Sequence, residues 1–230
     1  MEDNEKAGII GAYHAFLAKK DFACVAAKAA LTKNHIKCLV VEHMACPKDD
    51  EAILDFLYLF VDDYRTTTEP FHSVAIIFQE PQIHNEAMFE KFLWQRLQSL
   101  SNLDAKNYKY DNRVASDPSS AKFSYSLKEE AFFIIGLHPG SSRPTRQFAY
   151  PTIVFNPHAE FEKLREYDRY NKLKAVVRKR DMEYSGSLNP MLDDFGKTSE
   201  VYQYSGQKYE ADWQCPLQIN HAAPNHHSTP

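Results

Sequence analysis

Apolar and polar segments alternate along the chain and predict helices and strands in turn. The Ala-rich run at 21–35 predicts a helix with Asp21 as its N-cap. The short apolar runs at 37–43 and 71–78 predict strands, and the second is continuous enough to be buried on both faces. Residues 85–100 repeat apolar side chains at the helical period, so we expect an amphipathic helix there.

The most apolar stretch of the chain is Ile53–Val61, inside a helix that we predict to begin after Pro47. Acidic residues precede the stretch, as a helix N-terminus favours, and others follow it. A membrane span needs roughly 20 apolar residues, and this stretch is far shorter. We therefore expect a helix that is buried on most sides.

The polar run at 101–122 predicts the longest loop of the chain. Apolar runs at 131–137 and 151–155 predict two further strands, and the charged run at 158–181 predicts a long helix. Turn residues recur after that helix, and the tail at 221–230 is expected to be disordered.

This order of elements predicts a single domain over residues 1–220. Helices and strands alternate first, and two strands then follow one another closely. The expected fold is α/β (α+β), with a mixed β-sheet flanked by helices and an irregular C-terminal segment.

Composition narrows the classes of partner and the cellular compartment. The net charge of the 230-residue chain is -4 and no basic tract is present, which argues against nucleic acid and membrane surfaces as partners. None of the four cysteines forms a C-x-x-C pair, so neither a thiol zinc site nor a redox dithiol is expected. The N-terminus is acidic and does not resemble a signal peptide, so we expect a cytoplasmic protein with free thiols.

Several sequence motifs are absent. The chain lacks the phosphate-binding loop, the G-x-G-x-x-G turn, H-E-x-x-H and G-x-S-x-G. Nucleotide-hydrolysing, dinucleotide-binding, zinc-protease and α/β-hydrolase functions are therefore not first choices.

Two histidines follow the two later strands. His138 lies in the turn "HPG", where turn chemistry explains the Pro and the Gly but not the His. Asn156 is predicted to cap a helix and Pro157 to occupy its first turn, which places His158 at a helix N-terminus. That position favours neutral imidazole, the form that binds metals. For each histidine the alternative is an ordinary loop or surface side chain, and for His138 taken alone that alternative is favoured.

Charged residues near these histidines suggest ligand binding. Arg143 and Arg146 in "SSRPTRQF" could hold carboxylates by paired hydrogen bonds, although solvated loop charge is the better explanation for any single arginine. Asp193 and Asp194 in "GSLNPMLDDFG", together with Glu200, could receive a cationic group. Turn-forming aspartates are the alternative for the first two.

An ordered set of motifs over residues 123–217 resembles the YqcI/YcgG family. The motifs are "FSYS", "FFIIGLHPGSSRPTRQF", "PTIVFNPHAEFEKLR", "RDMEYSGSLNPMLDDFG", "SEVYQYSG" and "DWQCP". Members of this family with a known activity are haem-dependent N-hydroxylases that act on amine or guanidine nitrogens. The resemblance implies haem b (iron protoporphyrin IX), O2, an electron donor and a small cationic substrate that is arginine-like or derived from another amino acid.

The resemblance also implies roles for the candidate residues. His158 would be the axial iron ligand, and His138 would lie near the distal side or the haem propionates. Arg143 and Arg146 would hold propionates or a substrate carboxylate. The remaining candidates are acidic side chains for the substrate cation and an aromatic wall for the haem, namely Asp193, Asp194, Glu200 and Trp213.

Two other functions are compatible with the same residues. A haem-binding sensor or carrier would use the histidines and arginines without turnover. A non-haem metal hydrolase would use His138, His158 and Asp193 as ligands, although no metal-ligand spacing stands out. The oligomeric state, including a homodimer, is left open.

Overall fold

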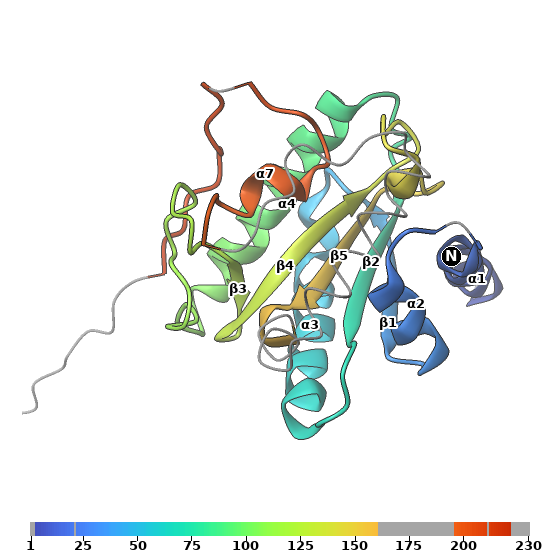
Figure 1. Cartoon of the computed structure of the whole chain (residues 1–230), viewed down its shortest axis with the longest axis horizontal. Coiled ribbons are helices and arrows are strands. Elements are labelled where there is room, and N and C mark those ends of the chain that lie inside the picture. Colours follow the sequence, from blue (N-terminus) through green and yellow to red (C-terminus); the bar gives the residue numbers. More distant parts are fainter. Residues whose placement is uncertain (1–2, 21, 161–195, 211, 222–230) are drawn as a thin grey trace, which may run out of the picture.

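Five strands form one mixed sheet at the centre of the molecule (Figure 1). The computed structural model describes residues 3–20, 22–160, 196–210 and 212–221. Its strands are β1 (Ile36–His43), β2 (Ser73–Glu80), β3 (Tyr125–Leu127), β4 (Glu130–Leu137) and β5 (Thr152–Pro157). Its α-helices are α1 (Asp3–Ala18), α2 (Val25–Thr32), α3 (Asp50–Thr66), α4 (Glu86–Asp104) and α7 (Val201–Tyr204), and its short 3-10 helices are η1 (Pro47–Asp49) and η2 (Pro144–Arg146).

The strand order across the sheet is β1-β2-β5-β4-β3. Strands β1 and β2 are parallel, whereas β5 is antiparallel to both of its neighbours, β2 and β4. Strands β3 and β4 form an antiparallel hairpin. The predicted α/β fold with a mixed sheet and flanking helices is therefore confirmed.

The sheet buries an apolar cluster on each of its faces. Helices α3 and α4 pack with alternate residues of β2 and β5, such as Ile76 and Phe155. Helices α1 and α2 pack with the residues between them, such as Ile77 and Val154. Strand β2 lies between β1 and β5 and is buried from residue 73 to residue 78, as its continuous apolar run predicted.

Two expectations about the N-terminal half were wrong, and one helix was not expected. Helix α2 begins at Val25, where the Cys24 side chain accepts a hydrogen bond from a backbone N–H, and Asp21 lies outside the described residues. Helix α3 is buried along one face and exposes Leu59 and Asp55 on the other, because its apolar residues follow the helical period. Helix α1 was not predicted.

The predicted helix cap at residues 156 and 157 was also wrong. Strand β5 continues through Pro157, which pairs with Phe132 of β4, and the helical turn begins at His158. The Asn156 side chain donates to the carbonyl of Phe133 across the sheet, at 3.2 Å. The Asn156 side chain therefore bonds to β4 and does not form the helix cap that the sequence had predicted.

The C-terminal segment is largely irregular, as expected, but it is anchored. After the short helix α7 it runs along α4, and Leu217 is buried in the core (Figure 1). His221, expected to be disordered, lies with its side chain 3.0 Å from the Asp104 carboxylate. Most of the helix predicted at 158–181 lies outside the described residues, as does the tail from residue 222. Within the described chain, no helix is long and apolar enough to cross a membrane.

Candidate functional site

The structure places His138 and His158 at opposite ends of one pair of strands. His138 follows the end of β4, and His158 follows the end of β5. These strands are antiparallel, with residues 132–137 paired with residues 157–152. At about 3.4 Å per residue, the two histidines are separated by roughly 20 Å. They therefore do not share one pocket, and a hydrolase centre that uses both as ligands of one metal ion is ruled out by this geometry.

His138 is fully buried in the turn after β4. Its ring stacks on Phe89 of α4, with 4.2 Å between ring centroids, and neither ring nitrogen has a hydrogen-bond partner among the described residues. Burial lowers the pKa of His138 to about 4, and the nearby positive charge of Arg146 acts in the same direction. The imidazole is therefore neutral at physiological pH.

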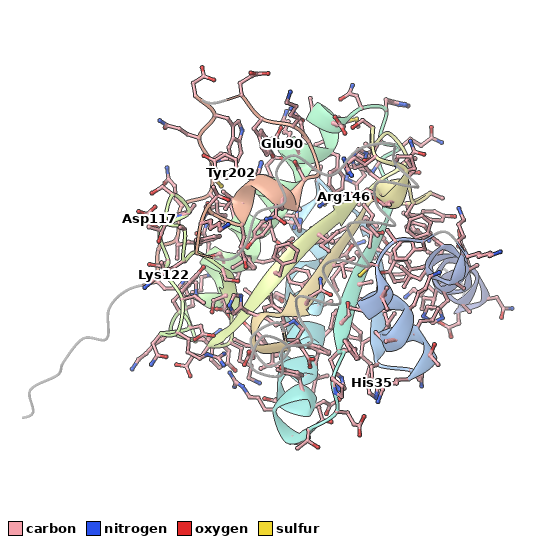
Figure 2. The ribbon with its side chains drawn as sticks, in the orientation of Figure 1. His35, Glu90, Asp117, Lys122, Arg146 and Tyr202 are labelled. Atoms are coloured by element: carbon pink, nitrogen blue, oxygen red, sulfur yellow. The ribbon has the colours of Figure 1, made fainter. Side chains whose placement is uncertain are left out.

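Arg146 is committed to the backbone rather than to a ligand. Its guanidinium donates to the carbonyls of Gln203 at 2.7 Å, Tyr204 at 3.2 Å and Gly136 at 3.4 Å. The first two are C-terminal carbonyls of α7, which have no partner within so short a helix. Arg146, labelled in Figure 2, thus ties α7 to β4, and the expected role of Arg146 as an anion clamp does not fit these contacts.

Arg143 lies at the same end of the sheet as His138. Its backbone N–H donates to the Ser141 hydroxyl, and its side chain is largely buried. The backbone of Arg143 thus lies toward the end of the β4–β5 pair opposite His158.

His158 faces a buried carboxylate. It begins the helical turn after β5, and its Nδ1 lies 3.4 Å from Oε1 of Glu200, just before α7. Both residues are nearly inaccessible to solvent, at 7% and 5% exposure. The contact does not have hydrogen-bond geometry, so it is an ion pair only when the imidazole is protonated. A metal-binding imidazole usually donates its other N–H to a carboxylate, and here the carboxylate is near but that hydrogen bond is not formed.

Glu200 is itself held by two hydroxyl groups that the sequence did not indicate. Its Oε2 accepts hydrogen bonds from Ser124 at 2.9 Å and from Tyr204 at 3.3 Å. Glu200 and Tyr204 are four residues apart, a spacing that could have revealed their contact. Ser124 is 76 residues distant in sequence, so only the fold brings it there. These contacts occupy the carboxylate that was expected to receive the substrate cation.

Trp213 lies in an aromatic cluster, and its ring contacts include neither histidine. Trp213 stacks on Tyr209, with 3.8 Å between ring centroids, and also contacts Tyr202 and Trp94. It belongs to an aromatic cluster between the C-terminal segment and α4, in the region of Tyr202 and Glu90 in Figure 2. Asp193 and Asp194 lie outside the described residues.

A surface cavity of about 510 Å³ lies between α3 and α4, away from all of these residues. Its lining mixes both signs of charge, with Lys48 and Lys106 beside Glu51 and Asp50. Asp50 is already paired with the buried Arg96 and does not offer a free carboxylate. The cavity therefore adds nothing to the histidine sites.

The His158 site fits a cofactor that needs one protein ligand. In the part of the chain that the structure describes, no three His, Cys, Asp or Glu side chains converge as metal ligands. Haem iron in many proteins takes a single proximal histidine, because the porphyrin supplies the other in-plane ligands. His158 supplies one buried imidazole, and its Nδ1 lies near the Glu200 carboxylate without a hydrogen bond to it.

The fold and this site define an α/β protein with a buried histidine–carboxylate pair at one end of a mixed sheet. A model of the YqcI/YcgG family matches residues 13–218, so the chain belongs to that family. An uncharacterised protein, YqcI of Bacillus subtilis (strain 168), is 24% identical over 187 residues, which cover 78% of this chain and 72% of that protein. No solved structure matches.

Proposed function

We propose that this protein is a haem-dependent N-hydroxylase that binds haem b through His158. The observation that carries the proposal is the burial of His158 beside the Glu200 carboxylate, with 3.4 Å between Nδ1 and Oε1. The family resemblance supports the chemistry: bound haem would activate O2 with electrons from a donor, for hydroxylation of an amine or guanidine nitrogen. The substrate would be a small cationic molecule, arginine-like or derived from another amino acid.

The protein's own residues would orient and shield this site. Strand β5 gives His158 a rigid base, because its residues pair on both sides with β2 and β4. The next turn is fixed as well, since the Glu160 carboxylate accepts a hydrogen bond from the backbone N–H of Phe71 at 2.9 Å. Burial of His158 excludes water from the ligand side of the site.

Spectroscopy of three histidine variants tests the proposed ligand. Protein expressed with haem supply should be coloured and show a Soret band. His158→Ala should lose the native ferrous–CO spectrum, whereas His138→Ala and the exposed control His84→Ala should retain it. Loss of the spectrum in His138→Ala alone would show that the iron ligand is His138, at the other end of the sheet. A preparation that cannot bind added haem would refute the proposal.

The catalytic part of the proposal needs a separate measurement, because a haem-binding sensor or carrier would give the same spectra. The haem-loaded protein is incubated with arginine and other amines, a reductant and O2, and products are analysed by mass spectrometry. The expected result is a gain of one oxygen by one of the amines. No product across a broad panel would favour the sensor or carrier.

A further inference from the structure

We infer that the surface cavity between α3 and α4 binds a free amino acid through its ammonium and carboxylate groups. The volume of this cavity, about 510 Å³, lies within the range of small-molecule sites, roughly 300–1,000 Å³. Pro47 and Leu103 give its lining apolar surface for an aliphatic side chain. Neither His138 nor His158 lines the cavity, so the inference does not rest on the proposed haem site.

One wall of the cavity is a single face of α4 and of the turn that follows it. The side chains of this wall share that face because of their helical spacing, namely Ser99, Asn102, Leu103 and Lys106. Lys106 is exposed, and its ammonium pairs with no other side chain in the described chain. It is therefore available to the carboxylate of a bound molecule.

Asn102 adds a second donor, and its orientation is determined by its neighbours. The Gln98 side chain accepts from the backbone N–H of Gln218 at 2.7 Å and donates to the carbonyl of the same residue at 2.7 Å. Because these two bonds fix which end of the Gln98 amide carries the nitrogen, that nitrogen also donates to the Asn102 oxygen, at 2.9 Å. The amide nitrogen of Asn102 thus remains as a donor on the same wall as Lys106, and a carboxylate can accept from both.

The opposite wall, at the start of α3, offers one unpaired carboxylate. Asp50 lines the cavity, but its two oxygens are taken by the buried Arg96 guanidinium and by the Ser99 hydroxyl. Glu51 also lines the cavity, is exposed, and pairs with no other side chain among the described residues. It is therefore the group that this wall presents to a cation.

The balance of charge in the lining favours a zwitterion over a simple anion or cation. Lys48 is already paired with Glu42 at 3.0 Å, and Asp50 is neutralised within the protein. Lys106 and Glu51 remain as one cation and one anion on facing walls, and they do not pair with each other. The carboxylate and the ammonium group of one amino acid complement both of them.

Titration calorimetry with three probes tests the inference: L-leucine, L-leucinamide and N-acetyl-L-leucine. Leucine should bind, and each of the others about fivefold more weakly, because each lacks one of the two charged groups. Lys106→Ala should weaken leucine binding about fivefold and leave leucinamide unchanged, whereas Glu51→Gln should weaken leucine binding similarly and leave N-acetylleucine unchanged. The exposed changes Lys109→Ala and Asp63→Asn lie outside the cavity and should alter none of these affinities.

Three results would overturn the inference. If no probe binds, Lys106 and Glu51 only complement the helix ends at which they lie. If N-acetylleucine binds as well as leucine does, the cavity is a simple anion site. If His158→Ala abolishes leucine binding while Lys106→Ala does not change it, the amino acid binds near the histidine instead. The inference expects His158→Ala to bind leucine as the wild type does, whether or not the protein binds haem.

Discussion

The burial of His138 has a direct consequence for stability at acidic pH. Its pKa in the folded protein is lowered to about 4 from an ordinary value of 6.5, chiefly by burial. As the pH falls through 6.5, the unfolded chain binds a proton that the folded protein excludes until about pH 4. The contribution of neutral His138 to the free energy of unfolding is thus fully present above pH 6.5. It is lost as the pH falls from 6.5 toward 4.

We expect His138→Phe to remove this part of the pH dependence. Phenylalanine keeps a flat ring to pack on Phe89 and has no proton to bind. Between pH 7 and pH 5, the wild type should lose about 2 kcal/mol more free energy of unfolding than the variant does. Urea unfolding at both pH values measures the difference, with the exposed His84→Phe as the control. Equal losses in wild type and His138→Phe would contradict the neutral, buried histidine.

The attachment of α7 to the sheet depends on Arg146. Removing its guanidinium leaves the carbonyls of Gln203, Tyr204 and Gly136 without their donor in a buried setting. Arg146→Ala should therefore lower the free energy of unfolding by about 3 kcal/mol or more. Arg146→Lys should recover little of it, because an ammonium cannot reproduce the planar fork of donors. Urea unfolding checks both variants against Lys208→Ala, which should lie within about 0.5 kcal/mol of the wild type.

Gly206 gives an internal check on the same attachment. Its φ of +85° is unfavourable for other residues, and an added Cβ would lie 2.7 Å from Cδ of Arg146. Gly206→Ala should destabilise the wild type more than it destabilises Arg146→Ala, because the clash disappears with the arginine. Equal costs in the two backgrounds would show that backbone conformation alone restricts this position.

The elements that sequence patterns predicted well are those with strong periodicity. Strands β1, β2, β4 and β5 and helix α4 follow their apolar patterns to within a few residues. Strand β3 has only three residues, so it carries too few side chains to show an alternation. Helix α1 contains two glycines and only weak separation of its polar and apolar faces, which hides its helical period.

The site could be predicted only in part, because its assembly depends on long-range strand direction. The sequence correctly indicated that histidines follow β4 and β5. Whether the ends of two strands meet depends on their relative direction, and the antiparallel pairing of β4 and β5 separates His138 from His158. Likewise, Ser124 reaches Glu200 only through the packing of α7 on the sheet. Residue types indicated candidates, and topology decided which of them are neighbours.

Asp104 joins parts of the whole molecule that are distant in sequence. At the end of α4 it is completely buried, and its carboxylate accepts hydrogen bonds from the Tyr58 hydroxyl of α3 at 2.7 Å and from the Lys128 N–H of the β3–β4 turn at 3.0 Å. The His221 ring lies 3.0 Å from its second oxygen and anchors the C-terminal segment. One carboxylate thus ties a helix, a hairpin and the C-terminal segment to α4.

Asp104→Ala should therefore loosen several regions at once. We expect the free energy of unfolding to fall by about 2 kcal/mol or more, since the half-buried donors of Tyr58 and Lys128 lose their acceptor. Backbone hydrogen exchange should accelerate both at Lys128 and along 212–221, because both segments depend on the same carboxylate. Asp117→Ala is the matched control: this exposed aspartate accepts only from Ser119 two residues away, so its effect should stay local. If exchange in Asp104→Ala accelerates at Lys128 but not along 212–221, the C-terminal segment is held by Leu217 and its other core contacts, and the His221 pair contributes little.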